Sequence, residues 1–167
     1  PSYTFIATAL AISQTGATPV FCDIESGGVN AQLPQFKRAL TEKTRAILPV
    51  HQFGVPIDMA PIREWARIHN LFIVEDAACA LGSEQAGTLV GSESSAAVFS
   101  FHPRKILTTG EGGMVVSCDG GLLDQVRSLA NFGISQGERD QTGGLAAFNA
   151  LGFNFRLSDI SAAVGRT

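Results

Sequence analysis

The fold is decided in the middle of the chain by the stretch Leu71-Phe-Ile-Val-Glu-Asp-Ala-Ala78. A continuous apolar run bounded by polar residues is typical of a strand in the core of a parallel sheet, so residues 71–75 are predicted to form one. Ligands of such sheets bind outside the carboxyl ends of the strands, which is where Asp76 stands. Asp76 is therefore a candidate binding residue, and the alternative is that it caps a helix beginning at Ala77.

Outward from this stretch, predicted strands and helices alternate in both directions. The sequence predicts further strands at 18–23, 45–50, 96–101 and 113–117, and helices at 4–15, 33–40, 58–69, 122–130 and after Ser158. Residues 134–151 are rich in Gly, Gln and Ala without a strong period and are predicted to be a loop. Alternation of this kind favours an α/β fold with a mostly parallel sheet flanked by helices.

Composition excludes several classes of function. The 167 residues are 45% hydrophobic and 16% charged, which is typical of one globular domain rather than a disordered chain. The net charge of −3, without a basic block, argues against nucleic-acid binding, and no apolar run approaches a membrane span. Three cysteines without CxxC spacing favour a reducing cytoplasm over a disulfide framework, and three scattered histidines form no metal pattern.

Two further stretches place polar groups at the ends of predicted elements. Ser100-Phe-His-Pro-Arg-Lys105 puts a lysine after a strand and before the turn Gly110-Glu-Gly-Gly113, although a lone loop lysine is usually only solvated. Neither a Walker A loop nor a dinucleotide fingerprint is present. Gly152-Phe-Asn-Phe-Arg156 brings an amide and a guanidinium in front of the last helix, and its alternative is an ordinary loop with a helix cap.

Taken together, segments along the whole chain resemble the sugar aminotransferases of the DegT/DnrJ/EryC1/StrS family, which depend on pyridoxal phosphate (PLP) and have the aspartate-aminotransferase fold, fold type I. Seven segments occur in family order: Pro1-Ser-Tyr-Thr-Phe-Ile-Ala-Thr8, Gly16-Ala-Thr-Pro-Val-Phe-Cys-Asp23, Val50-His-Gln-Phe-Gly54, Val74-Glu-Asp-Ala-Ala78, Ser100-Phe-His-Pro-Arg-Lys105, Gly110-Glu-Gly-Gly-Met-Val115 and Gly152-Phe-Asn-Phe-Arg156. Each segment alone is weak evidence, whereas seven in order are specific.

The resemblance implies that residues 1–167 are a partial PLP-binding large domain. The family's Gly-Thr phosphate-binding turn would precede residue 1, and the smaller C-terminal domain would follow residue 167. The chain begins without an initiator methionine and ends inside a predicted helix, so we expect sequence to be missing on both sides. Part of the site would then be absent, and the chain by itself is expected to be inactive.

The resemblance also implies a role for each matching residue. Lys105 would form the Schiff base with the cofactor aldehyde, and its amine must be free to attack. Asp76 would pair with the pyridine nitrogen and keep the ring protonated, which makes it an electron sink. Ser100 would hydrogen-bond the cofactor phosphate, and Phe5 would stack on the ring.

Three more residues match family positions. Asn154 and Arg156 would reach into the site of the neighbouring subunit of a homodimer, where Asn154 would contact phosphate and Arg156 the substrate. Cys79 stands next to the cofactor's phenolic oxygen, where the family usually has Gln or His. A thiol is a weaker hydrogen-bond donor, so this departure affects how the cofactor is tuned.

The function implied is transamination of a nucleotide-linked keto-sugar, with glutamate as the expected amino donor, in amino-sugar synthesis for lipopolysaccharide or another polysaccharide. One alternative in the same family is a pyridoxamine-dependent sugar dehydratase, which has histidine in place of the Schiff-base lysine. Another is a non-catalytic regulatory protein, which would be expected to lose Lys105 or Asp76. The sequence keeps both residues.

Overall fold

The computed structural model describes residues 1–134 and 147–167. Its centre is a four-stranded sheet in the order β1 (Ala46–Ile47), β2 (Phe72–Asp76), β5 (Ala96–Ser100) and β6 (Gly113–Val116). β1, β2 and β5 run parallel, while β6 is antiparallel to β5. The predicted α/β fold with a mostly parallel sheet is confirmed.

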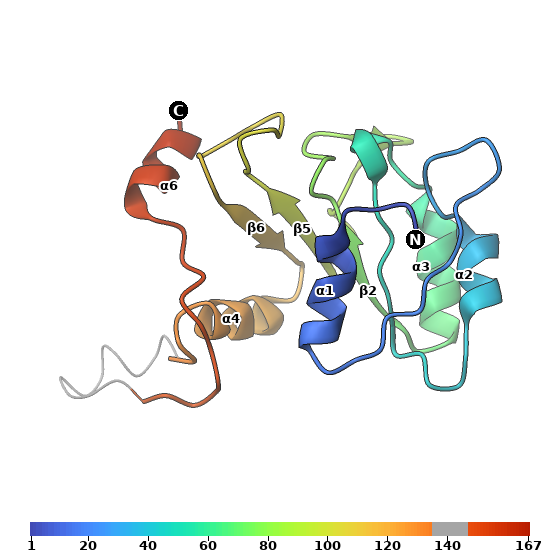
Figure 1. Ribbon diagram of the computed structural model, residues 1–167, viewed down its shortest axis with the longest axis horizontal. Coiled ribbons are helices and arrows are strands. Elements are labelled where there is room, and N and C mark those ends of the chain that lie inside the picture. Colours follow the sequence, from blue (N-terminus) through green and yellow to red (C-terminus); the bar gives the residue numbers. More distant parts are fainter. Residues whose placement is uncertain (135–146) are drawn as a thin grey trace.

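The helices lie around this sheet (Figure 1). They are α1 (Ile6–Gln14), α2 (Leu33–Ala39), α3 (Met59–Ile68), α4 (Gly120–Leu129) and α6 (Asp159–Gly165), with a 3₁₀ turn at Gln52–Gly54. The helices predicted at 58–69 and after Ser158 begin at side-chain caps: Asp58 accepts from the Ala60 amide at α3, and Ser158 from the Ser161 amide at α6. In Figure 1, α2 and α3 lie at one end of the sheet, and α4 and α6 at the other.

The main core lies between α2, α3 and the strands β1 and β2. Its members are the buried side chains Ala31, Phe36, Ile47, Ile57, Met59, Ile62, Trp65, Ala66 and Ile73.

On the exposed side of α3, Arg67 lowers the pKa of the Glu64 carboxyl, chiefly by a side-chain hydrogen bond and then by its charge. Within the described part of the chain, no helix has the length and apolarity that crossing a membrane requires.

β2 departs from the expected continuously buried strand. Ile73 and Glu75 are buried, whereas Phe72 is 43% exposed and Val74 and Asp76 are half-buried. Neighbouring side chains of a strand point to opposite faces, so Ile73 and Glu75 share the face that α3 covers. The other face is only partly covered, and Asp76 is on it.

Two of the predicted strands were wrong or incomplete. Residues 18–23 form no strand, because the Ser2 amide donates to the Cys22 carbonyl but no ladder of backbone hydrogen bonds continues from there. The strand expected at 45–50 is reduced to Ala46–Ile47, since Pro49 has no N–H to continue the ladder. Val50 resumes the pairing as an isolated bridge to Asp76.

A small hairpin was not predicted from the sequence. β3 (Glu84–Gln85) and β4 (Thr88–Leu89) pair antiparallel around Ala86 and Gly87, which have φ angles of 51° and 79°. Two positive φ angles in a two-residue loop are typical of a type I′ turn, and the Gly in that loop was the available signal.

Of the predicted loop at 134–151, residues 135–146 lie outside the described residues, and its two sides meet at a bridge between Ile134 and Phe148.

Candidate active site

Asp76 ends β2 with both carboxylate oxygens engaged. Its Oδ2 accepts a hydrogen bond of 2.7 Å from the Thr8 hydroxyl of α1, and its Oδ1 accepts one of 3.1 Å from the Ala78 amide. The capping interpretation is therefore correct in a limited sense, because Oδ1 caps a turn at residues 77–80 rather than a helix. Oδ2 instead faces the partly covered side of the sheet.

Lys105 lies on the connection between β5 and β6. This connection is closed at its base by hydrogen bonds from the Phe101 amide to the Gly112 carbonyl and from the Thr109 amide to the Phe101 carbonyl. The half-buried Lys105 side chain extends to Cys79, and its Nζ donates to Sγ at 3.0 Å. Cys79 belongs to the turn that Asp76 caps, so the structure brings the lysine to the carboxyl end of β2.

Ser100 and Phe5 border the same region from different elements. Ser100 is the last residue of β5, and its Oγ accepts from the His102 amide at 3.3 Å, which leaves the hydroxyl hydrogen available to a ligand. Phe5 is the N-cap residue of α1 and is 71% exposed. Thr8, one turn further along α1, contacts Asp76 directly.

Asn154 and Arg156 lie elsewhere in the fold. They belong to an extended segment beside the end of α4, where the Phe155 amide donates to the Ala130 carbonyl (Figure 1). Arg156 Nε donates to Asn154 Oδ1 at 2.9 Å, and its guanidinium lies 5.4 Å from the centre of the Phe132 ring. Both side chains are exposed, and the structure does not bring them to Asp76 or Lys105 of their own chain.

Thr8 is the site residue that the sequence analysis missed. Its hydroxyl donates to Asp76 and also lies 2.9 Å from the Thr4 hydroxyl. The available signal was a pair of hydroxyl residues four positions apart at the start of an otherwise apolar helix, since such residues share one helix face.

Lys105, Asp76 and Ser100 suit a ligand that carries three different functional groups. A primary amine can bind a carbonyl carbon, a carboxylate held by two donors can pair with a ring N–H, and a hydroxyl at a strand end can donate to a phosphate. The mostly parallel sheet flanked by helices is the architecture of the fold type I aminotransferases, and solved aminotransferases superpose on it.

More narrowly, the chain belongs to the DegT/DnrJ/EryC1/StrS aminotransferase family, whose family model matches residues 1–167. It is 41% identical over 165 residues to a GDP-perosamine synthase of Caulobacter vibrioides, covering 99% of this chain and 43% of that protein. It is 43% identical over 167 residues to the dTDP-3-amino-3,4,6-trideoxy-alpha-D-glucose transaminase of Streptomyces venezuelae, covering 99% of this chain and 42% of that protein.

Solved structures show the same relationship. An aminotransferase from Psychrobacter cryohalolentis matches with a TM-score of 0.92 and 36% identity, over 98% of this chain and 42% of that chain. Spr1654 of Streptococcus pneumoniae, a candidate sugar aminotransferase solved in its PLP form, matches with a TM-score of 0.86 and 28% identity, over 99% of this chain and 46% of that chain. The chain thus spans less than half the length of the relatives that it matches.

Proposed function

We propose that the protein is a PLP-dependent aminotransferase that converts a nucleotide-linked keto-sugar into the corresponding amino-sugar, with glutamate as the amino donor. The observation that carries the proposal is the contact between Lys105 Nζ and Cys79 Sγ, 3.0 Å apart, because it puts an amine at the edge of the sheet where Asp76 ends β2. The family and the names of the two relatives given above support the reaction class and the nucleotide-linked substrate.

The groups present fit PLP. Asp76 would accept the hydrogen bond of the ring nitrogen, Ser100 would donate to the phosphate, and Phe5 at the exposed start of α1 would cover the ring. When bound, PLP supplies an aldehyde for the amino group and a ring that takes up the electron pair left on the substrate carbon. Residues 1–167 would form most of the large domain that holds it.

Lys105 would have two tasks. Its Nζ would hold the cofactor through the aldehyde carbon, with loss of water, before substrate arrives. Once the amino donor has displaced it, the same Nζ would accept a proton from the carbon that bears the donor's amino group and deliver it to the cofactor carbon. The Cys79 contact orients the amine toward the turn at 77–80. A dehydratase of the same family would have histidine in place of Lys105, and a regulatory relative would be expected to lose Lys105 or Asp76, so the retained pair favours transamination.

The assembly and location are proposed on chemical grounds. We place the reaction in the cytoplasm because Cys22, Cys79 and Cys118 are all free thiols and activated nucleotide-sugars are the substrate class. The active unit is proposed to be a homodimer in which Asn154 and Arg156 serve the neighbouring site, since both are exposed and remote from their own Lys105. The amino-sugar product would enter polysaccharide synthesis, including that of lipopolysaccharide.

The experiment is a substrate panel. Full-length protein is loaded with pyridoxamine phosphate and mixed with keto-sugars that carry GDP, dTDP or UDP, and the loss of the pyridoxamine absorption is followed. One sugar of the panel should bleach it at a rate that depends on concentration, with release of an amino-sugar identified by mass. Protein that binds the cofactor yet reacts with no keto-sugar, while forming a dehydrated product from a hydroxy-sugar, would contradict transamination and favour the dehydratase.

A further inference from the structure

A buried pair of side chains lies directly behind the candidate active site. His51 and Glu75 have side-chain exposures of 0% and 2%, and His51 Nε2 lies 2.9 Å from Glu75 Oε2. His51 follows the bridge residue Val50, and Glu75 precedes Asp76. Neither residue has a task in the chemistry proposed above.

The hydrogen bonds around the pair fix its orientation. The Ile57 amide donates to His51 Nδ1 at 3.0 Å, so the ring carries its proton on Nε2 and donates it to Glu75. Glu75 Oε2 also accepts from the Gly91 amide at 3.1 Å. A buried carboxylate persists only when donors compensate for the lost water, and here two donors converge on one oxygen.

This network continues into the backbone of Asp76. The His51 amide donates to the Asp76 carbonyl at 3.0 Å, and the Asp76 amide donates to the Pro49 carbonyl at 2.8 Å. The segment after His51 also supports the turn that carries Cys79: a Cβ on Gly54 would lie 2.9 Å from the Cys79 carbonyl oxygen. Anchoring the His51 side chain therefore holds the segment against which both Asp76 and Cys79 rest.

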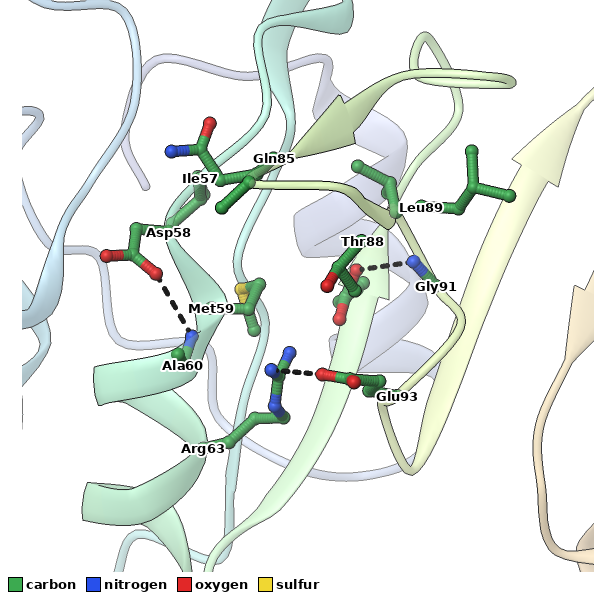
Figure 2. Close-up of a pocket in the computed structure, with 13 residues that line it drawn as sticks. Ile57, Asp58, Met59, Ala60, Arg63, Gln85, Thr88, Leu89, Gly91 and Glu93 are labelled. Carbon is green, nitrogen blue, oxygen red and sulfur yellow. Dashed lines mark hydrogen bonds and ion pairs between the residues drawn. The ribbon is translucent and has the colours of Figure 1, made fainter.

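The pair acts from the opposite face of β2. Glu75 lines a cavity of about 90 Å³ between α3 and the β3–β4 hairpin. Figure 2 shows residues that line this cavity, with Asp58 and Arg63 on the side of α3 and the ion pair between Arg63 and Glu93 at one side of it. Because adjacent side chains of a strand point to opposite faces, Glu75 points away from the face on which Asp76 accepts the hydrogen bond from Thr8.

We propose that His51 and Glu75 are positioning residues, which hold Asp76 and Cys79 in the orientation that binds the cofactor without touching it. The inference rests on the proposed function. A positioning role requires that loss of the network lowers the affinity for PLP and alters the absorption of the bound cofactor while the fold persists.

The main variant is the double substitution His51→Leu with Glu75→Met, made in the full-length protein. Replacing both partners by apolar side chains of similar size removes the cross-link without leaving an unpaired buried charge, so the protein should fold. We expect the Kd for PLP to rise roughly tenfold, the loss that accompanies about one hydrogen bond, with a shifted visible band. The melting temperature should fall, because the Ile57 and Gly91 amides lose their acceptors, but the protein should remain folded.

Three further variants make the result decisive. Glu75→Gln can keep both hydrogen bonds through its amide oxygen, so its Kd and spectrum should match wild type. Arg63→Gln breaks the ion pair with Glu93 that lines the same cavity, and its Kd and spectrum should also match wild type. If the double variant does not fold, His51→Gln replaces it: this side chain still reaches Glu75 but meets the Ile57 amide poorly, and its Kd should rise by roughly threefold or more.

The outcomes test the positioning role separately from the proposed aminotransferase function. Wild-type protein that acquires no cofactor on Lys105 would overturn the proposed function and this inference together. Wild-type protein that acquires it, while the folded variant keeps the same Kd and the same spectrum, would overturn the positioning role alone and leave the pair as part of the packing.

Discussion

Lys105 Nζ and Cys79 Sγ are 3.0 Å apart, although 26 positions separate them in the sequence. The contact joins the β5–β6 connection to the turn after β2. Cys79, where the resemblance to the family leads us to expect Gln or His, therefore touches the proposed catalytic amine itself.

Lys105 should be the residue that carries the cofactor. Full-length protein loaded with PLP is expected to show a visible absorption band that disappears on borohydride reduction, because the reduced bond between the amine and the cofactor no longer absorbs there. Peptide mass mapping should then find the added mass on Lys105. A reduced adduct on Lys37 or Lys43, the other two lysines of this chain, would refute the assignment.

The substitution Asp76→Asn should distinguish the role of the Asp76 charge from its role as a hydrogen-bonding cap. The amide oxygen can still accept from the Ala78 amide, and the Thr8 hydroxyl can turn to accept from the new NH₂ group, since Thr4 and Thr8 can exchange donor roles. The fold is therefore expected to survive while turnover falls by orders of magnitude, because the charge that keeps the ring protonated is lost. Steady-state kinetics beside circular dichroism measure both, and near-normal turnover would restrict Asp76 to the capping role.

Cys79→Gln should change the spectrum of the bound cofactor. The substitution restores a side chain that the family uses and replaces a weak thiol donor by an amide. We expect a shift in the position or the pH dependence of the visible band. Cys79→Ala, which removes the donor without replacing it, is the comparison variant. Identical spectra for wild type and both variants would show that Cys79 does not adjoin the cofactor.

Shared sites in a homodimer can be tested by mixing two inactive proteins. A Lys105→Ala subunit would still lend Arg156 to its partner, and an Arg156→Ala subunit would keep its own Lys105. Statistical mixing makes half of the dimers mixed, each with one working site, so roughly a quarter of wild-type activity should return. If subunit exchange is verified by mass and no activity returns, each subunit uses its own Arg156 or none.

The core between α3 and the sheet should dominate the stability of this region. Ile62 is fully buried on α3, so Ile62→Ala is expected to lower the free energy of unfolding by about 2–5 kcal/mol through lost burial and a cavity. Ile68→Ala is the control on the same helix, where the side chain is 65% exposed, and should change it by less than about 0.5 kcal/mol. Urea denaturation compares the two, and equal losses would contradict this account.

The sequence predicted the elements whose signals are local. The strand at 71–75 and the helices at 58–69 and after Ser158 appear in the structure within a residue or two of the expected bounds. The strand at 18–23 was wrong because a strand depends on a partner elsewhere in the chain, which its own residues do not reveal. The same holds for the site. Asp76 and Lys105 could be proposed from their positions after predicted strands, whereas the contact of Thr8 with Asp76 joins residues 68 positions apart and could not be predicted from either segment.

The antiparallel pairing of β5 with β6 has a consequence for the order in which the site forms. The two strands are joined by residues 101–112, so closing the loop around Lys105 costs less chain entropy than a contact between residues much further apart in the sequence. The Thr8–Asp76 contact requires a loop of 68 positions and the docking of α1. Contacts of low sequence separation form sooner, so during refolding we expect the lysine loop to become structured first and the second hydrogen bond of Asp76 to come last.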